Sequence, residues 1–336
     1  MTSQIFEPNG EGIQAAAAVL RRGGIVAFPT ETVYGLGADA FNEEAVRRIY
    51  AVKGRPADNP SIVHIARASD IGLLTPAVAP DVVRLADAFW PGPLTMIVEK
   101  RPEVPGVTTG GLATVGVRLP DSDIARALIR AAGSPVAAPS ANPSGRPSPT
   151  AAAHVLADFE GARPGAGLAP DAVLRGPDCR IGIESTVVDM TASPPAVLRP
   201  GYVTAYDLSN VLGVDVTDAR EGGGEEGAAP KAPGMKYRHY APEAEMLVIE
   251  GAREKVESEI GRLKTLNEGI GRRVGVMLFE EEAYMRAAHD FFARLRALDR
   301  EGVDLILAGA LPMADGLGFA VMNRMMKAAG YNIVKV

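Results

Sequence analysis

The sequence is poor in cysteine, in aromatic residues and in long apolar runs. Cys179 is the single cysteine among 336 residues, so the chain can form neither an internal disulfide nor a cysteine-based zinc site, and we expect a small buried residue there. Aromatic residues make up 5% of the chain and do not alternate with basic ones, as they do in proteins that read single-stranded nucleic acid. An alanine-rich run at residues 15–20 is too short to cross a bilayer.

Positive charge is not in excess either. The net charge is −6, and acidic and basic residues are spread evenly over both halves, so neither half is a basic platform for nucleic acid. The first residues, "MTSQIFEPNGEG", contain neither the basic start nor the apolar core of a secretory signal. We therefore expect a cytoplasmic protein that does not associate with membranes.

Two common nucleotide-binding motifs are missing as well. The stretch "FPTETVYGLG" contains a G-x-G pattern at Gly35 and Gly37, but Ala40 stands where the dinucleotide fingerprint needs a third glycine. The G-K-S or G-K-T of a Walker A loop does not occur in the chain. We interpret the two glycines as turn formers that let the chain pass close to a ligand, and a nucleotide would need other residues.

What the sequence does contain is an alternation of helix and strand patterns. Apolar periodicity and capping residues predict helices over residues 11–22, 42–54, 80–89 and 121–132. Between and after them lie short runs that are often β-branched, such as "PSIVHIA", "LTMIVEK", "TVGVRLP", "SPVAAPSA" and "STVVDM". These patterns predict a mixed α/β domain, which we place at residues 1–205.

A second domain follows a change in composition near residue 220. The segment "REGGGEEGAAPKAPGM" has glycines, prolines and charges but no apolar periodicity, which indicates a linker at residues 206–242. Beyond it, three strand patterns alternate with three helical patterns. This order predicts a small, parallel, doubly wound sheet at residues 243–336.

Polar side chains gather first in two places near the N-terminus. The polar residues of 30–34 follow a buried strand, where α/β sheets bind ligands, although a plain turn explains these hydroxyl groups equally well. The segment "KGRPADNPSIVHI" then brings Lys53, Arg55, Asn59 and His64 onto one short path. The two cations could stabilise a helix end, or they could bind a polyphosphate.

Two further clusters lie downstream. Arg118 stands inside a strand pattern, where a buried guanidinium needs an anionic partner from the protein or from a ligand. The segment "APSANPSGRPSPT" is either a surface loop or a set of donors to an anion or a nucleobase. Its candidate donors are Ser140, Asn142 and Ser148. Ser185 and Arg199 complete a set in which cations and hydroxyl groups outnumber paired carboxylates, which favours an anionic substrate such as a nucleotide.

The order of these motifs resembles a known family. "PTETVYGLGADA", "KGRPADNP", "SANPSG", "ESTVVD", "LRPG" and "APGMKYRHYAP" follow one another as in the YrdC-like threonylcarbamoyl-AMP synthases of the longer, two-domain type. The resemblance runs from about residue 10 to the C-terminus. One departure is Ser61, which follows "DNP" at a place where an apolar residue is expected.

The resemblance implies an enzyme that combines L-threonine, bicarbonate and ATP into L-threonylcarbamoyl-AMP and pyrophosphate. This reaction is the first stage of the threonylcarbamoyl modification of tRNA adenosine. The implied fold is a twisted, YrdC-like α/β domain with a concave basic site, followed by a smaller Rossmann-like C-terminal domain, with the linker closing over the site. Downstream tRNA threonylcarbamoyl-transferase proteins would be partners, and direct tRNA binding is left open.

The resemblance also assigns residues to ligands. L-threonine would lie against Thr32, His64, Arg118, the backbone at Ala138, and Ser185. ATP would lie against Lys53, Arg55, Asn59, Thr114, Ser140, Asn142, Ser148, Arg199 and Tyr240. Lys53 and Arg55 would be the catalytic cations. Mg²⁺ would arrive on the triphosphate rather than on protein ligands, because it keeps several of its waters.

The sequence allows three alternatives to this enzyme. In one, the C-terminal domain would sense a nucleotide for regulation, but Gly316 and Gly318 are too weak a pattern to support it. A non-catalytic module that binds RNA or a nucleotide could use the same concave surface, but the acidic net charge argues against RNA binding. Hydrogenase-maturation proteins also include a domain of this type, together with zinc-type cysteine motifs. The single cysteine excludes that architecture.

Overall fold

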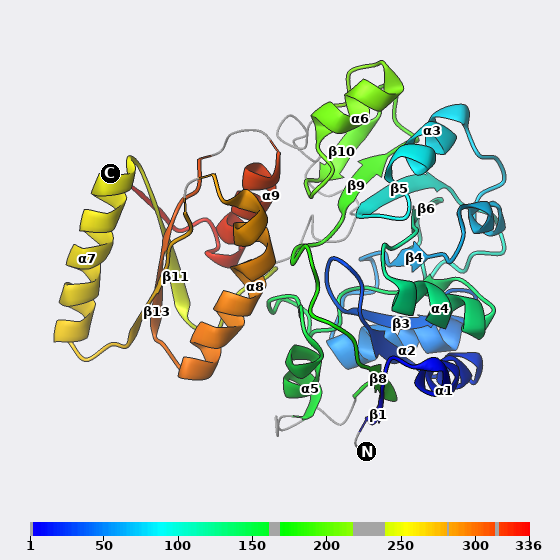
Figure 1. Cartoon of the computed structure of the whole chain (residues 1–336), viewed down its shortest axis with the longest axis horizontal. Coiled ribbons are helices and arrows are strands. Elements are labelled where there is room, and N and C mark those ends of the chain that lie inside the picture. The colour runs from blue at the N-terminus through cyan, green and yellow to red at the C-terminus, as the bar shows by residue number, and fades with distance from the viewer. Residues whose placement is uncertain (1–2, 161–168, 218–238, 281, 313–315) are drawn as a thin grey trace.

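The structure is a computed structural model of the whole chain, and it describes residues 3–160, 169–217, 239–280, 282–312 and 316–336. These residues form two domains, each built on its own sheet, that lie side by side (Figure 1). In this described part of the chain, no helix is long and apolar enough to cross a membrane.

The first domain is built on a ten-stranded mixed sheet. Its strands are β1 (Gln4–Phe6), β2 (Val26–Phe28), β3 (Gly35–Asp39), β4 (Ile62–His64), β5 (Leu94–Glu99), β6 (Thr114–Arg118), β7 (Val136–Ala137), β8 (Ala172–Leu174), β9 (Thr186–Asp189) and β10 (Ala196–Arg199). Their order in the sheet is β1-β8-β2-β3-β7-β4-β6-β5-β9-β10. The helices are α1 (Gly10–Arg21), α2 (Glu43–Lys53), α3 (Pro80–Phe89), α4 (Asp123–Ala132), α5 (Ala152–Glu160) and α6 (Ala205–Leu212), with a 3-10 helix, η1, at Ala68–Leu73. The predicted mixed α/β domain is confirmed.

The helices of this domain begin and end where the sequence marks them. The side chain of Asn42 accepts a hydrogen bond from the N–H group of Ala45 at the start of α2, and Gly54 ends this helix with a φ of 60°. Ser122 caps α4 in the same way, and Gly133 follows it with a φ of 78°. Glycine adopts this left-handed conformation without strain, which explains why both helices stop there.

The two glycines of "YGLG" do not form a turn. Both lie inside β3, which pairs with β2 in antiparallel orientation. A Cβ atom on Gly37 would lie 2.6 Å from the ring of Phe28 and 2.6 Å from the side chain of Val136. A side chain at Gly37 is therefore excluded by close packing. The interpretation of these glycines as turn formers is wrong, whereas the close approach of this segment to a ligand stays a prediction.

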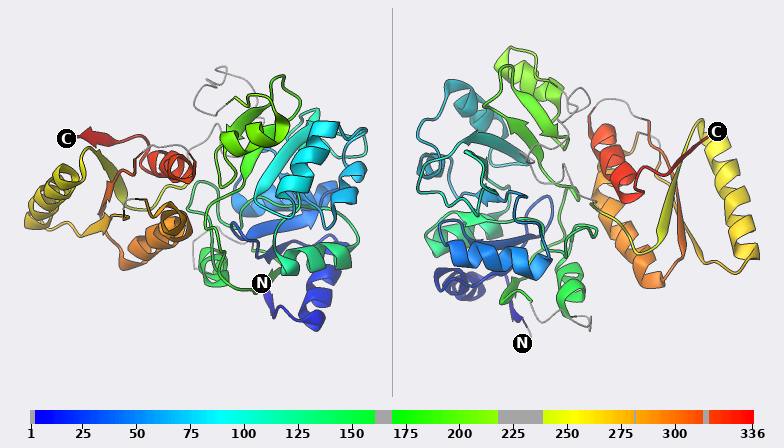
Figure 2. Two further views of the ribbon diagram at one scale, coloured as in Figure 1. Left: turned by 45° about the horizontal axis from the view of Figure 1, so that its top comes forward. Right: turned by 180° about the vertical axis from the view of Figure 1, so that it is seen from behind.

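The C-terminal domain alternates strands and helices. Its elements are β11 (Glu245–Glu250), α7 (Arg253–Gly269), β12 (Val274–Met277), α8 (Tyr284–Glu301), β13 (Leu305–Gly309), α9 (Leu317–Ala328) and β14 (Ile333–Lys335). The strands pair in parallel in the order β12-β13-β11-β14. Helix α7 covers one face of this sheet, whereas α8 and α9 cover the face turned toward the first domain (Figures 1 and 2). The predicted parallel, doubly wound sheet is confirmed, with β14 as a strand that the sequence analysis missed.

The two domains share an apolar cluster. Ile181 and Ile183 of the first domain are buried in one cluster with Phe292 of α8 and Val321 of α9. Between the two isoleucines, Gly182 has a φ of 83°, and a Cβ atom there would lie 2.5 Å from the carbonyl oxygen of Ala288. The backbone of this segment is therefore in direct contact with α8.

The predicted linker lies largely outside the described residues, which omit 218–238. Its first part contains α6, which contacts α3 of the first domain. At its other end, the N–H group of Ala241 donates to the carbonyl oxygen of Gly145 at 2.8 Å. The last residues of the linker segment therefore contact the first domain again.

Candidate active site

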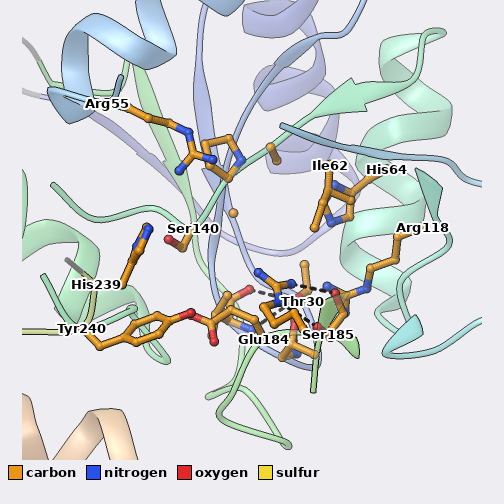
Figure 3. A pocket seen from close by; sticks show the side chains of 16 residues that line it. Thr30, Arg55, Ile62, His64, Arg118, Ser140, Glu184, Ser185, His239 and Tyr240 are labelled. Carbon is orange, nitrogen blue, oxygen red and sulfur yellow. Dashed lines mark hydrogen bonds between the residues drawn. The ribbon is translucent and has the colours of Figure 1, made fainter. Parts of the chain in front are cut away.

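A cavity lies where the polar segments of the first domain meet the last residues of the linker segment (Figure 3). Its walls come from the segment after β2, from β4, β6 and β10, and from several loops. The residues that line it are Thr30, Thr32, Val33, Gly35, Arg55, Ile62, His64, Arg118, Ala138, Pro139, Ser140, Glu184, Ser185, Arg199, His239 and Tyr240.

All five residues assigned to L-threonine line this cavity; they are Thr32, His64, Arg118, Ala138 and Ser185. Strand register explains part of this grouping, because His64 of β4 pairs directly with Arg118 of β6. The N–H group of Ala138 donates to the carbonyl oxygen of Ile62 at 2.9 Å, which fixes the next segment beside β4. Contact of these five residues with an amino acid stays a prediction.

The guanidinium group of Arg118 is buried and keeps hydrogen-bonding capacity. Its Nε atom donates to the carbonyl oxygen of Gly92 at 3.3 Å, and its Nη2 atom lies 2.7 Å from Oε1 of Glu31. The orientation of this ion pair is unsuitable for a hydrogen bond, so Nη2 has no hydrogen-bond partner among the described residues. Because a guanidinium binds a carboxylate through two N–H groups, Arg118 can receive a carboxylate from the cavity.

His64 is held in its neutral form. Burial and the charge of Arg118 lower the pKa of this imidazole to about 3. The ring packs edge-on against Phe28, with 6.1 Å between the ring centroids. Its Nδ1 atom is buried without a hydrogen-bond partner in the described part of the chain, so this nitrogen is available to a ligand.

His239 also lines the cavity, and the sequence analysis missed it. Burial and the nearby Arg55 and Lys327 lower the pKa of this histidine to about 4. Its Nε2 atom is buried and has no partner within the described residues. The available signal was its place beside Tyr240 in the motif "YRHYAP".

Four of the nine residues assigned to ATP line the cavity, namely Arg55, Ser140, Arg199 and Tyr240. The Nη2 atom of Arg55 donates to Oδ1 of Asn59 at 2.7 Å and to the carbonyl oxygen of Pro60 at 2.8 Å. Asn59 thus orients Arg55 from behind the wall.

Lys53 and Asn142 also lie behind the wall. There they hold residues 138–150, the segment "APSANPSGRPSPT", which we call the serine-rich loop. The Nζ atom of Lys53 is buried and donates to the carbonyl oxygens of Ser140 and Asn142. The side-chain amide of Asn142 donates to the carbonyl oxygen of Arg146 at 2.9 Å. Both side chains therefore fix the loop in this structure, and their direct contact with ATP stays a prediction.

Ser148 and Thr114 do not line the cavity either. The hydroxyl group of Ser148 donates to Oε1 of Glu184 at 2.5 Å, so it acts on the wall through a carboxylate. Thr114 lies at the start of β6, opposite Glu99 of β5, at the other end of the strand from Arg118. Contact of either residue with ATP also stays a prediction.

Glu184 is a carboxylate in the cavity wall that the sequence analysis did not identify. Burial opposes its ionised form, but the guanidinium groups of Arg324 and Arg199 and the hydroxyl group of Ser148 outweigh burial and lower the pKa of this carboxyl group. The signal that could have found it was its position directly before Ser185 in "ESTVVD". Glu184 is therefore ionised at neutral pH.

The charge of the cavity is positive. Arg55, Arg118 and Arg199 line it, while the carboxylates of Glu31 and Glu184 each face an arginine. Among the residues that the structure describes, no group of three or more His, Cys, Asp or Glu side chains is placed to hold a metal ion. This arrangement suits a ligand with several negative charges that brings its own counter-ion.

Comparisons with known proteins agree with this architecture. A family described as "Telomere recombination" matches residues 18–201, and a family described as "Threonylcarbamoyl-AMP synthase, C-terminal domain" matches residues 203–330. Threonylcarbamoyl-AMP synthase of Pyrococcus abyssi is 47% identical over 335 residues, which cover 96% of each chain. Threonylcarbamoyl-AMP synthase of Bacillus subtilis is 43% identical, with 97% of this chain and 95% of the relative covered.

Solved structures extend the likeness to three dimensions. The crystal structure of P. abyssi Sua5 complexed with L-threonine matches with a TM-score of 0.92 and 44% identity, and all of both chains is covered. Both relatives match this chain over nearly their full length and are named as synthases, so they do not support the non-catalytic alternative. This chain therefore belongs to the YrdC-like threonylcarbamoyl-AMP synthases of the two-domain type.

Proposed function

We propose that this protein combines L-threonine, bicarbonate and ATP into L-threonylcarbamoyl-AMP and pyrophosphate. One observation carries the proposal: a single cationic cavity joins the unsatisfied guanidinium of Arg118 to the guanidinium groups of Arg55 and Arg199. Such a cavity can hold an amino-acid carboxylate at one place and a polyphosphate at another. The relative crystallised with L-threonine supports the amino-acid half of the proposal.

The amino acid would be held at the Arg118 side. Its carboxylate would pair with this guanidinium, and the neutral His64 and the hydroxyl group of Thr32 would accept or donate hydrogen bonds to the rest of the molecule. Serine differs from threonine by one methyl group, which a pocket rewards by about 1 to 3 kcal/mol. We therefore expect a preference for threonine together with some activity toward serine.

The first chemical step would be formation of a carbamate. The uncharged amine of threonine attacks the carbon of bicarbonate, a C–N bond forms, and one oxygen of bicarbonate leaves as water together with the amine proton. With dissolved CO2 the same attack releases only the proton. The pKa of His64 lies at about 3, so this imidazole serves as a hydrogen-bonding group rather than as a store for that proton.

The second step would transfer the adenylyl group. A carbamate oxygen attacks the α-phosphorus of ATP, and the bond from that phosphorus to pyrophosphate breaks. Holding the two reactants in line and stabilising the extra charge are the main requirements. Arg55 and Arg199, which line the cavity, would stabilise this charge, together with Lys53 behind the loop. Magnesium would enter as part of the substrate, MgATP.

The product is a mixed anhydride and is consumed by a further transfer. We propose that tRNA threonylcarbamoyl-transferase proteins use it to modify tRNA adenosine, and that the reaction takes place in the cytoplasm with those proteins.

The test is an incubation of the purified full-length protein with MgATP, bicarbonate and L-threonine. We expect threonylcarbamoyl-AMP by mass spectrometry and an equal amount of pyrophosphate. Each substrate is omitted in turn as a control. Pyrophosphate release that does not depend on threonine and bicarbonate would show that the protein is not this synthase.

A further inference from the structure

Glu184 joins three separate parts of the chain at the cavity wall. Its carboxylate accepts a hydrogen bond from Ser148 Oγ at 2.5 Å and one from Arg324 Nε at 3.1 Å. The hydroxyl group of Tyr240 makes a third side-chain hydrogen bond to it, and Figure 3 shows this tyrosine reaching toward Glu184. The serine-rich loop, the end of the linker segment and the C-terminal domain thus meet at one carboxylate.

Arg324 is the contribution of the C-terminal domain. It lies on α9, and its side chain is fully buried, with an exposed fraction of 0%. Besides its bond to the Glu184 carboxylate, its Nη1 atom donates to the carbonyl oxygen of Pro200, directly after Arg199. Arg324 therefore contacts a side chain in one wall segment and the backbone in another, although it does not line the cavity itself.

The backbone before Glu184 is also set by the C-terminal domain. Ile181 and Ile183 are buried against α8 and α9, and Gly182 leaves no room for a side chain beside Ala288. The position of Glu184 therefore depends on α8 and α9 in two ways. Arg324 of α9 binds its carboxylate, and the residues directly before it pack against both helices.

From this geometry we infer that Arg324 of the C-terminal domain is a positioning residue for the proposed reaction: it holds Glu184, whose contacts with Ser148 and Tyr240 keep the serine-rich loop and the end of the linker segment in place for the nucleotide. The inference rests on the proposed function. It assigns the C-terminal domain a role in the chemistry of the first domain, through one buried ion pair.

The ion pair has two consequences for a nucleotide. It balances the negative charge of Glu184, which would otherwise repel a triphosphate in a poorly hydrated wall. It also leaves Glu184 as an acceptor for Ser148 and Tyr240, so that both stay in place. The threonine-side residue Arg118 has its own partner, Glu31. Loss of Arg324 should therefore weaken ATP binding more than threonine binding.

The experiment compares Arg324→Lys and Arg324→Met with the wild-type protein in the pyrophosphate assay. Lysine keeps the charge but loses the planar group that reaches two partners. If Arg324→Met fails to fold, Arg324→Lys alone still tests the inference. For either folded variant we expect the KM for ATP to rise at least tenfold, while the dissociation constant for L-threonine, measured by calorimetry, changes less than twofold. Arg324→Lys should keep more activity than Arg324→Met.

Arg294→Met is the matched control. This arginine also lies in the C-terminal domain, where it donates to the carbonyl oxygen of Leu278 and stacks over the ring of Phe279, away from the cavity. It should leave the KM for ATP unchanged even if it lowers stability. An equal rise for Arg294→Met would show that any damage to this domain has the same effect, and would overturn the inference.

A double variant tests whether the effect passes through Glu184. Tyr240→Phe removes one donor to this carboxylate, so Arg324→Lys combined with Tyr240→Phe should raise the KM for ATP by less than the product of the two single effects. Full multiplication, or an unchanged ATP dependence in Arg324→Lys, would overturn the inference while the wild-type protein still makes product. Absence of product from the wild-type protein would instead overturn the proposed function.

Discussion

The Nη2 atom of Arg118 lies 2.7 Å from Oε1 of Glu31, and the exposed fractions of the two side chains are 4% and 2%. Burying such a pair costs desolvation energy that its attraction only partly offsets. At a cavity the pair has a use, because it orients the guanidinium while Nη2 keeps its hydrogen-bonding capacity. An amino-acid carboxylate can then bind Arg118 without a rearrangement of the wall.

Arg118→Ala should raise the KM for L-threonine far more than the KM for ATP. A charge-assisted, two-point contact contributes about 2 to 3 kcal/mol, so we expect a 30-fold to 150-fold rise for threonine. The variant also leaves Glu31 without its cation, so the free energy of unfolding should fall. Steady-state kinetics with each substrate varied in turn gives both constants.

Arg126→Ala is the control for the Arg118 variant. Arg126 pairs with Asp121 and Asp123 on the surface, outside the cavity, and its loss should change neither constant by more than twofold. A rise in the KM for ATP alone in Arg118→Ala would place this arginine at the nucleotide instead.

Acidification should destabilise the protein through His64. The pKa of His64 is about 3 in the folded protein and about 6.5 in an unfolded chain. Between these values the unfolded chain binds a proton at this residue and the folded protein does not, so stability is lost as the pH falls below 6.5. From pH 7 to pH 4.5 this one group should lower the free energy of unfolding by about 2 to 3 kcal/mol.

The measurement is urea unfolding of the wild-type protein and of His64→Gln at both pH values. Glutamine does not titrate, so the variant should lose less stability on acidification than the wild-type protein, by about the amount given above. His154 and His239, whose pKa values are also lowered, act in the same direction in both proteins. An equal loss in wild type and variant would mean that His64 is not held neutral.

The sequence predicts the local elements of this fold better than their assembly. Asn42 and Gly54 mark the ends of α2 because caps act over a few residues. The order of ten strands is different: β1 pairs with β8, so that Gln4 lies opposite Ala172. Such pairings depend on packing between segments that are far apart in the sequence. Local periodicity does not reveal which of these segments become neighbours.

The same limit applies to the candidate site. The threonine-side residues lie in motifs with clear strand patterns, and all of them line the cavity. Glu184 is hard to identify from the sequence because a single carboxylate is not a typical ligand for an anion. Arg324 was overlooked because it lies on a helix whose pattern predicts only an apolar face, and the bond to Glu184 crosses 140 positions of the sequence.

Gly182→Ala should separate the C-terminal domain from the cavity wall. With a φ of 83°, an alanine here is strained, and its Cβ atom would lie 2.5 Å from backbone atoms of α8. Gly111 has a similar φ of 85°, but nothing lies within 4 Å of a Cβ atom there. Gly111→Ala should therefore lose about 1 to 2 kcal/mol of stability from backbone strain alone. Gly182→Ala should lose more and should also raise the KM for ATP. Equal losses from both variants would show that the contact with α8 is readily relieved.

Lys53→Met tests whether this lysine acts through the serine-rich loop or on a phosphate. Its ammonium group is buried against the carbonyl oxygens of Ser140 and Asn142, and burial and the nearby Arg55 lower its pKa. Removing it leaves two carbonyl groups without their donor, so the loop should open more often even without ATP. Hydrogen exchange of the loop amides should then be faster in the ATP-free variant than in the wild-type protein. Lys100→Met, which frees the carbonyl oxygen of Val104 instead, should leave that exchange unchanged. Unchanged exchange in Lys53→Met together with a lower kcat would favour direct contact with the phosphates.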